Sequence, residues 1–286
     1  MQTSRCADAS SFLHATAAYR SRYALQTNVI GSVATSIADG LQRYDASWWW
    51  LVLEQDHVVG AACRTAPFCL QLGPMGRDAA AALSRRLAVE DDGFPCVNGD
   101  PTTVDSFLET YASTGSPGSR RAPHLELENI IYEARDLHIP DVPGVLRPAT
   151  MTQFDLASRW MTDFSTFING HPYQPTHHDV EALRARIDAS MLYFWWRGDE
   201  PVAMAGHASP VTIGTETVTR VAPVFTPEEH RRHGFAAAVT AVLTKRLVER
   251  HARVMLLADA NYPTSNGVYR RIGYVAVDRL VRVELA

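Results

Sequence analysis

One stretch of the chain has residue types and spacing suited to holding a phosphate. The pattern Arg231-x-x-Gly234-x-Ala236 stands between an apolar run and the start of a long helical pattern. The first turn of a helix leaves backbone N–H groups unpaired and carries partial positive charge, so it favours an anion. Glycine admits close approach of a phosphate to the backbone, and Arg231 and Arg232 add charge. By itself, the pattern also fits a surface helix with arginines at its N-terminus.

A second stretch follows the predicted helix, and the two stretches together are more specific than the first alone. It runs from Asp259 to Tyr274 and contains Ser-Asn266-x-x-Tyr269-x-x-x-Gly273-Tyr274. In this order, the two stretches resemble motifs A and B of the GNAT superfamily of acyl-CoA N-acyltransferases. The form Val-Phe-Thr-Pro-Glu-Glu-His-Arg-Arg-His-Gly-Phe-Ala is similar to the bacterial subgroup with an FR47-like C-terminal domain, which often carries a degenerate N-terminal GNAT half. The resemblance is strong over about Met191–Val283 and weak before it.

The resemblance implies an acetyl-CoA site in the second half, with acetyl-CoA as co-substrate. The backbone of a bulged strand over Ala222–Thr226 would bind the pantetheine arm, and the amides from Arg231 to Ala236 would hold the pyrophosphate. The strand Arg253–Ala258 would splay away and leave a slot for the thioester. Pro223 lacks an N–H and fits a break in strand pairing, or simply an edge strand. The cofactor-binding residues expected are Val224, Phe225, Thr226, Arg231, Arg232, His233, Gly234, Phe235, Ala236, Asn261 and Asn266.

Two of these residues depart from a simple match. The subgroup usually places an asparagine directly before the proline, whereas this chain has Tyr262 there and Asn261 one residue earlier. Asn266 could bond the pantetheine amides or cap the short helix that follows.

Tyr269 stands where many family members carry a tyrosine that protonates the departing CoA thiolate. Attack of an amine on a thioester gives a tetrahedral intermediate, and a phenol near the sulfur can supply the proton when the intermediate collapses. A backbone N–H near Val224 would stabilise the oxyanion. The alternative for Tyr269 is an aromatic residue that only packs the helix.

The sequence points less clearly to the base that takes the proton of the amine. His207, in Ala-Gly-His at the end of a predicted strand, is the preferred candidate because neutral imidazole accepts a proton near pH 7. A structural histidine bonded to the backbone is the alternative. Glu216 lies on a predicted hairpin, where a solvated turn carboxylate is favoured over a catalytic base. Substrate-facing residues are expected on the helix Trp160–Gly170, and the aromatic-rich loop from His171 to His178 is expected to contact the substrate.

Neither the histidines nor the cysteines form a metal pattern. His171, His177 and His178 lack ligand spacing on a helix, so no metal is expected. The four cysteines are Cys6, Cys63, Cys69 and Cys96, without a C-x-x-C. We expect buried free thiols, with a disulfide as the alternative, and on that basis a cytoplasmic location. All four precede the second half, so a covalent cysteine-acetyl intermediate is not available there.

The elements that must position these residues form two similar series. The series of the second half comprises helices over Thr152–Phe167 and Asp179–Ala189, strands over Met191–Trp196, Pro201–His207 and Thr217–Phe225, the helix Phe235–His251, the strand Arg253–Ala258, the helix Ser265–Ile272 and the strand Tyr274–Leu285. The series of the first half comprises a helical pattern over Ala9–Gly40, strands over Trp48–Leu53, Val58–Cys63 and Phe68–Leu72, the helix Ala79–Val89, a helix after Pro101 through Tyr111, a loop over Gly115–Ser119 and a strand over Leu125–Ala134.

The linker His138–Gly144 carries two prolines and a glycine and separates the two series. We therefore expect a degenerate GNAT-like domain over residues 1–140 and a catalytic GNAT domain over residues 145–286. The matching turns Asp56-His57-Val58 and Asp199-Glu200-Pro201 support a two-copy repeat, against chance similarity of two α/β units.

The two copies differ where the chemistry is expected. The interval from Val59 to Leu87 is 17 residues shorter than that from Val202 to Leu247. The missing part corresponds to the phosphate loop and its strand, so no cofactor is expected in the first half. That half would pack against the other and close one wall of the substrate cleft, and Trp48-Trp49-Trp50 would pack its core and sheet.

Composition limits the possible functions. The 286 residues are 46% hydrophobic and 20% charged, with a net charge of −4, which is typical of a globular protein and not of a nucleic-acid binder. No apolar run is long enough to cross a bilayer, and no secretory signal is expected. The fold expected is α+β, with tandem GNAT-like halves that each have a mixed, mostly antiparallel twisted sheet flanked by helices.

The expected activity is transfer of acetyl from acetyl-CoA to a primary amine of a small molecule, by direct attack in a ternary complex. The expected partners are therefore that amine, with neither nucleic acid nor membrane, in a monomer or homodimer. The alternatives are another acyl-CoA, a protein amine, or a non-catalytic acyl-CoA-binding sensor.

Overall fold

The first half of the chain forms one of the two α/β units of the molecule, here called wings. The computed structural model describes residues 1–90, 93–114, 124–250 and 252–285. The elements of this half are β1 (Gln2–Arg5), α1 (Ala9–Ala15), α2 (Ala17–Arg22), α3 (Asn28–Ala38), β2 (Ser47–Glu54), β3 (His57–Thr65), β4 (Leu70–Leu72), α4 (Arg77–Glu90), β5 (Cys96–Gly99), α5 (Pro101–Thr114) and β6 (His124–Ala134). The predicted loop Gly115–Ser119 lies outside the described residues.

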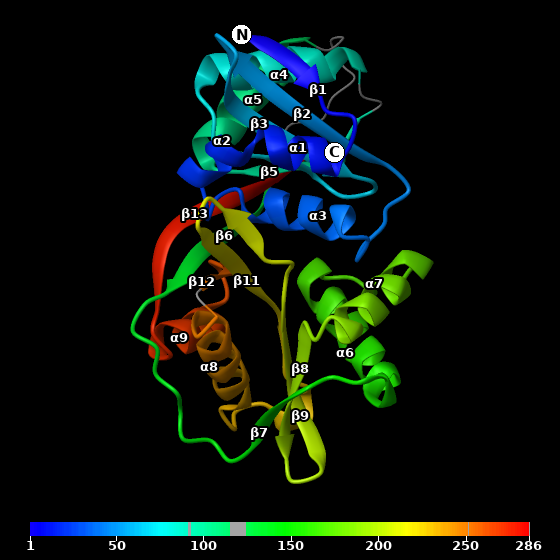
Figure 1. The fold of residues 1–286 in the computed structure, drawn as a ribbon, viewed down its shortest axis with the longest axis vertical. Coiled ribbons are helices and arrows are strands. Elements are labelled where there is room, and N and C mark those ends of the chain that lie inside the picture. The colour runs from blue at the N-terminus through cyan, green and yellow to red at the C-terminus, as the bar shows by residue number, and fades with distance from the viewer. Residues whose placement is uncertain (91–92, 115–123, 251, 286) are drawn as a thin grey trace.

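The second half repeats this series and forms the other wing (Figure 1). Its elements are β7 (Val145–Pro148), the 3₁₀ turn η1 (Met151–Gln153), α6 (Phe154–Asn169), α7 (His177–Asp188), β8 (Leu192–Arg197), β9 (Glu200–His207), β10 (Val211–Ile213), β11 (Glu216–Phe225), the 3₁₀ turn η2 (Glu228–His230), α8 (Phe235–Val248), β12 (Ala252–Asp259), α9 (Pro263–Arg271) and β13 (Tyr274–Glu284). The two-copy repeat and the α+β class predicted from the sequence are confirmed.

Local chemistry explains where several of these helices begin and end. Thr176 and Asp179 form a reciprocal capping box at the start of α7. Asp100 accepts a hydrogen bond from the Thr103 amide at the start of α5, where Pro101 occupies the first turn. The last turn of α8 carries Lys245 and Arg246, whose charges suit the negative end of the helix dipole.

All the strands but β10 follow one path through a single sheet, in the order β1-β2-β3-β4-β5-β13-β6-β12-β11-β9-β8-β7, and β10 pairs with β11. The sequence predicted a sheet in each half, and the structure joins the two. The join is an exchange of the last strand of each half: β13 pairs with β5 of the first half, and β6 pairs with β12 of the second. β6 and β13 also pair with each other, antiparallel, from Tyr274↔Ala134 to Glu284↔His124.

Apolar clusters fill both faces of this sheet. In the second half, α8 packs on one face against a cluster that includes Ala203, Ala205 and Val221. Helices α6 and α7 cover the opposite face, over Leu192, Phe194 and Met204. The helices therefore enclose the sheet in two layers, and β11 runs between them (Figure 1). Where the halves meet, Ala24 and Leu25 pack with Val211, Val218 and Leu280.

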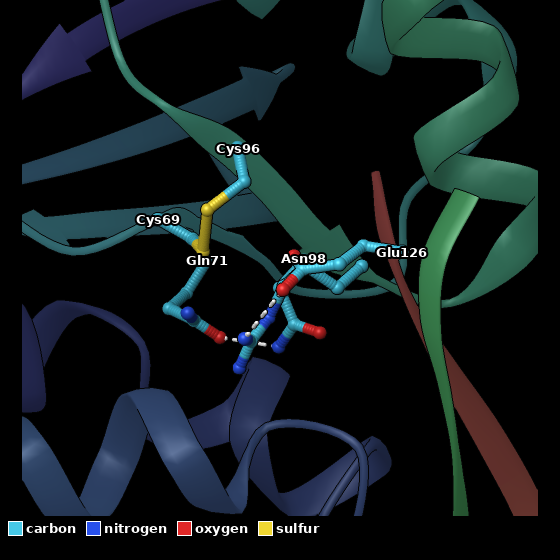
Figure 2. The surroundings of a disulfide bond; sticks show 6 residues. Cys69, Gln71, Cys96, Asn98 and Glu126 are labelled. Carbon is cyan, nitrogen blue, oxygen red and sulfur yellow. Dashed lines mark hydrogen bonds and ion pairs between the residues drawn. A yellow bond between two sulfur atoms is a disulfide. The ribbon is translucent and has the colours of Figure 1, made fainter. Parts of the chain in front are cut away.

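The cysteines are a correction to the sequence analysis. Cys69 and Cys96 form a disulfide, whereas Cys63 is buried and Cys6 partly buried as free thiols. The bond forms because β4 and β5 pair in parallel, with Leu70 opposite Val97, which brings the preceding cysteines face to face. Figure 2 shows the bond beside Gln71 and Asn98, whose side chains are hydrogen-bonded at 2.6 Å. The disulfide removes the basis on which a cytoplasmic location was expected.

None of the helices in the described ranges is long and apolar enough to cross a membrane. Within those same ranges, no group of three or more His, Cys, Asp or Glu residues could hold a metal ion.

Candidate active site

The strand β11 is irregular where the sequence predicts the contact with pantetheine. Its pairing with β9 shifts register between Val221 and Val224, and the Ala222–Pro223 peptide bond in that interval is cis. Pro223 has no N–H to give to the ladder, as the sequence analysis anticipated. The irregularity leaves Ala222 and Pro223, directly before Val224, out of the regular pairing with β9.

The neighbouring strand diverges from β11 at the same level. Pairing between β11 and β12 extends from Thr217↔Ala252 to Arg220↔Met255 and stops there. The rest of β11 stays with β9, through Val224↔Ala205 and Phe225↔Met204, while the rest of β12 stays with β6, through Asp259↔Asn129. The two strands therefore separate beyond Arg220 and form the V-shaped opening that the resemblance implied.

The first half has no such opening at the equivalent strands. There β4 and β5 stay paired through Gln71↔Asn98, and the Leu72 carbonyl oxygen would lie 2.9 Å from a Cβ on Gly99. The loop from Gly73 to Gly76 leads directly into α4, where the second half has a longer loop with η2. The shorter spacing predicted that the first half lacks both the phosphate loop and the strand before it. The structure keeps that strand as β4, with three residues.

The residues from Arg231 to Ala236 turn the chain into α8 with a free helix N-terminus. Arg232 and Gly234 both have positive φ, 67° and 79°, and Gly234 is the N-cap without a side-chain hydrogen bond. The Ala238 amide donates to the Gly234 carbonyl at 3.0 Å, so the amides of the preceding first turn have no acceptor within the helix. These amides and the two exposed arginines suit a pyrophosphate.

Other residues expected in the cofactor site lie close in the chain. Arg231 Nε donates to the Thr226 carbonyl at 3.2 Å, and the Thr226 hydroxyl is a buried group without a partner in the described part of the chain. The His233 ring stacks on Phe235 at 5.5 Å between centroids. The end of β11, the loop and the start of α8 therefore form one contiguous surface, whose free amides and unpaired hydroxyl fit an anionic cofactor.

Asn266 and Asn261 have different surroundings. Asn266 is 4% exposed, and its Nδ2 donates to the carbonyls of Asp259 and Tyr262 at 2.8 and 2.9 Å. It thus fixes the turn between β12 and α9, and it does not cap α9, which has no side-chain cap. Asn261 is exposed, and its backbone amide donates to Asp259.

Tyr269 lies on α9 between two other tyrosines. Its ring centroid is 6.2 Å from that of Tyr132 on β6 and 6.2 Å from that of Tyr274 on β13. Burial raises the pKa of Tyr269 to about 12, so its hydroxyl stays protonated at neutral pH and can donate a proton. Among the described residues no hydrogen bond engages this hydroxyl, in contrast to the Tyr274 hydroxyl, which is 2.6 Å from Thr244 Oγ1.

His207 ends β9 opposite Val221, where the irregularity of β11 begins. Strand alternation puts its side chain on the face of Ala203 and Ala205, which is covered by α8. The ring lies 6.4 Å from that of Tyr193, and its Nδ1 is 3.0 Å from the Ala208 carbonyl oxygen. Burial lowers the pKa of His207, as do the charges of Arg186 and Arg250. The contact with the Ala208 carbonyl fits the structural alternative, and His207 as the base stays a prediction.

A cavity of about 330 Å³ lies on the other face of the sheet, between the two halves. Ala222 and Pro223 of β11 line it, so it borders the strand irregularity. Helix α6 contributes Met161, Thr162, Phe164 and Ser165, within the Trp160–Gly170 helix predicted to face the substrate. The walls supplied by other segments include Ser32, Ser36, Tyr44, Tyr173, Asp179, Arg186, Ser209 and Arg220.

The sequence analysis missed several of these residues. Arg186 and Arg220 stand within helical and strand patterns without any motif, and Tyr44 lies in an unpatterned connection. Helix α3 of the first half contacts β10 and β11 and contributes Ser32 and Ser36 to the same cavity.

Comparison with known proteins agrees with this geometry. Residues 212–283 match the family model described as FR47-like protein. No curated protein sequence matches the chain. Among solved structures, a GNAT-family acetyltransferase from Colwellia psychrerythraea matches with a TM-score of 0.62 and 11% identity over 100% of both chains. A GCN5-related N-acetyltransferase from Kribbella flavida matches with a TM-score of 0.55 and 18% identity over 90% of this chain and 95% of that one.

A tandem GNAT protein from the clavulanic acid biosynthesis pathway has the same two-copy organisation. It matches with a TM-score of 0.57 and 11% identity over 99% of this chain and 97% of that one. At these identities the likeness concerns the fold, while the FR47-like match assigns the segment that carries β11, α8 and α9. This chain therefore has the tandem GNAT fold along its length, and residues 212–283 of its second half match the FR47-like family model.

Proposed function

We propose that the protein is an N-acetyltransferase that moves acetyl from acetyl-CoA to a primary amine of a small molecule. Acyl transfer is the general chemistry that the GNAT fold and the FR47-like match support. The observation that carries the proposal is the separation of β11 from β12 beyond Arg220, directly before the uncapped N-terminus of α8. Together they provide an opening for a thioester and free amides for a pyrophosphate.

The chain's own groups suggest how the reaction proceeds. The amine nitrogen attacks the thioester carbonyl carbon, and a backbone N–H near Val224 stabilises the oxyanion. Collapse of the tetrahedral intermediate breaks the carbon–sulfur bond, and the Tyr269 hydroxyl protonates the leaving thiolate. The proton that the amine nitrogen loses passes through solvent and restores the Tyr269 hydroxyl. The amine reaches the thioester from the cavity that Ala222 and Pro223 line, so both substrates are bound when the acyl group moves.

The enclosure of the cavity favours a small acceptor over a protein amine. Residues of both halves line it, including Ser32, Ser36 and Tyr44 from the first. Residues of α3 and α6 line the cavity together with Ala222 and Pro223 of β11.

Release of free thiol from acyl-CoA, measured with panels of amines and acyl donors, tests the proposal. Amine-dependent release from acetyl-CoA is the expected result. Thiol release only with a longer acyl-CoA would show that acetyl-CoA is not the donor. Binding of acetyl-CoA without thiol release for any amine would favour a non-catalytic acyl-CoA-binding sensor.

The phosphate contact can be tested by changing Gly234. Gly234→Glu places a negative side chain where the pyrophosphate is expected, and we expect acetyl-CoA binding measured by calorimetry to be lost. The matched control is Gly214→Glu, because Gly214 also has a positive φ, 61°, but lies in the β10–β11 hairpin. The control shares the backbone strain, so equal loss in both variants would assign the effect to folding and remove the phosphate assignment.

A further inference from the structure

Two arginines line the cavity, and among the described residues neither is ion-paired with a carboxylate. Arg186 extends from α7 and Arg220 from β11. Arg186 Nη2 donates to the carbonyls of His207 and Ala222 at 2.9 and 2.7 Å, and Arg220 Nη1 lies 3.5 Å from Asn28 Oδ1. Within the described ranges no Asp or Glu forms an ion pair with either guanidinium. Ion pairs between arginine and a carboxylate occur elsewhere, mostly on the surface.

The charge of Arg220 acts on Arg186, so an anion in the cavity would stabilise both guanidinium groups. Burial, together with the charge of Arg220, lowers the pKa of Arg186 to about 10, and burial lowers the pKa of Arg220 to about 10. Both remain protonated at neutral pH. Like charges held together away from water are costly unless an opposite charge joins them. An anion in the cavity would therefore be bound more strongly here than at an exposed arginine.

The arginines adjoin the place where the acetyl group is expected. Arg186 bonds the Ala222 carbonyl, within the irregular part of β11, and Ala222 itself lines the cavity. Asp179 also lines the cavity, and its Oδ2 accepts hydrogen bonds from Tyr173 and Thr176 at 2.8 and 2.7 Å. The cavity thus has cationic groups beside β11 and an acidic group contributed by the start of α7.

We propose that Arg186 and Arg220 bind a carboxylate of the acceptor, and that the acceptor is an α-amino acid. The inference rests on the proposed function, because the amine must meet the thioester beside β11. An anion held by arginines at that strand must lie close to the amine in the molecule, and an α-amino acid has this arrangement. Planar guanidinium groups suit the planar carboxylate.

Matched pairs of substrates test the proposal. Each pair is an amino acid and the amine left by its decarboxylation, such as phenylalanine and phenethylamine, or alanine and ethylamine. For the wild-type protein we expect kcat/KM to be about 100-fold higher for the amino acid, the order expected for charge-assisted hydrogen bonds. Arg220→Met should raise KM for the amino acid by about 10- to 100-fold and change that for the amine little. Arg220→Lys should retain part of the preference, because it keeps the charge.

Arg246→Met is the matched control. Arg246 also donates to a backbone carbonyl, that of Leu146, at 3.0 Å, and it lies over the Tyr193 ring, outside the cavity. The preference for the amino acid should survive this change. Loss of the preference in Arg246→Met, or its survival in Arg220→Met, would overturn the proposal.

The proposal and the function beneath it fail in different ways. A wild-type protein that acetylates amines without regard to the carboxylate overturns the inference and leaves the function intact. A protein that binds acetyl-CoA but acetylates nothing overturns the function. Calorimetric titration of phenylalanine into the protein saturated with CoA then decides the inference: binding lost in Arg220→Met supports it, and absence of binding to the wild type overturns it. The melting temperature and acetyl-CoA affinity of each variant confirm that it is folded.

Discussion

Tyr269 is the residue whose surroundings best separate a chemical role from a packing role. Its ring packs between Tyr132 and Tyr274, as a structural residue's would, but no hydrogen bond to the described residues engages its hydroxyl. The Tyr274 hydroxyl, in contrast, is engaged by Thr244. The two tyrosines therefore form a natural comparison, one with a free hydroxyl and one with a structural hydroxyl.

Tyr269→Phe should lower kcat by about 10- to 1000-fold and leave acetyl-CoA affinity nearly unchanged. The low end is expected because a thiolate leaves readily and water can replace the phenol in part. Since the pKa of Tyr269 is raised to about 12, its protonation adds no falling limb to the pH–rate profile below about pH 11. Tyr274→Phe should instead lower the melting temperature with kcat retained. Wild-type kcat in the Tyr269 variant, with chemistry rate-limiting, would leave Tyr269 as a packing residue.

At the scale of the element, the strongest contrast is between β4–β5 and β11–β12. Both pairs are parallel, but the first stays together to its ends and the second separates. The disulfide joins β4 to β5 and closes a loop with a sequence separation of 27 residues. Its contribution is expected to be to stability, away from the cavity.

Replacing both Cys69 and Cys96 by alanine should lower the free energy of unfolding by about 3 to 4 kcal/mol, from the entropy of closing a loop of this length. Denaturant unfolding measures the change, and kcat should stay within about twofold of the wild type. Cys6→Ala serves as the control, because Cys6 is a free thiol. A fall in kcat in the double variant without a fall in stability would place the disulfide in the function.

Long and strongly patterned elements were predictable from the sequence, and most short ones were not, although the three-residue β4 lies within the predicted strand Phe68–Leu72. The prediction of strands at β2, β3, β8, β9 and β11 is confirmed, because each has a run of apolar or β-favouring residues. The strands β1, β5, β7 and β10 were missed, because each has only three or four residues. The helical pattern expected over Ala9–Gly40 is divided into α1, α2 and α3, and at the first break Thr16 Oγ1 donates to the Phe12 carbonyl.

The residues of the site also differ in how far the sequence predicts them. The loop before α8 and Tyr269 are predictable because local motifs mark them. The side on which His207 lies and the meeting of Arg186 with Arg220 depend on how α7, β9 and β11 pack, which no local pattern encodes.

For the whole molecule, the exchange of β6 and β13 determines whether the halves can exist apart. A cut between residues 140 and 145 follows the linker and separates the repeats, but β6, which the cut assigns to the first part, pairs with both β12 and β13 of the second. The division into residues 1–140 and 145–286 stays a prediction, and the shared sheet bears on what each part can do alone.

Residues 145–286 expressed alone should therefore lack a cooperative unfolding transition and bind acetyl-CoA far more weakly than the full chain, because β12 and β13 lose the strand between them. Co-expression with residues 1–144 should restore both properties in a complex. Calorimetry and circular dichroism on the fragment, the complex and the full chain make the comparison. A folded 145–286 fragment with full affinity would show that β6 is dispensable.

The exchanged strands also bear on how the chain acquires its structure during synthesis. The first half cannot complete its sheet until β13, which ends at Glu284, has left the ribosome, because β5 has no other partner on that side. Contacts between β5 and β13 span most of the chain, and such distant pairing slows folding. Until then, β5 and β6 expose unpaired strand edges to other nascent chains. Loss of β13 (Tyr274–Glu284) would thus damage the half of the molecule that was made first.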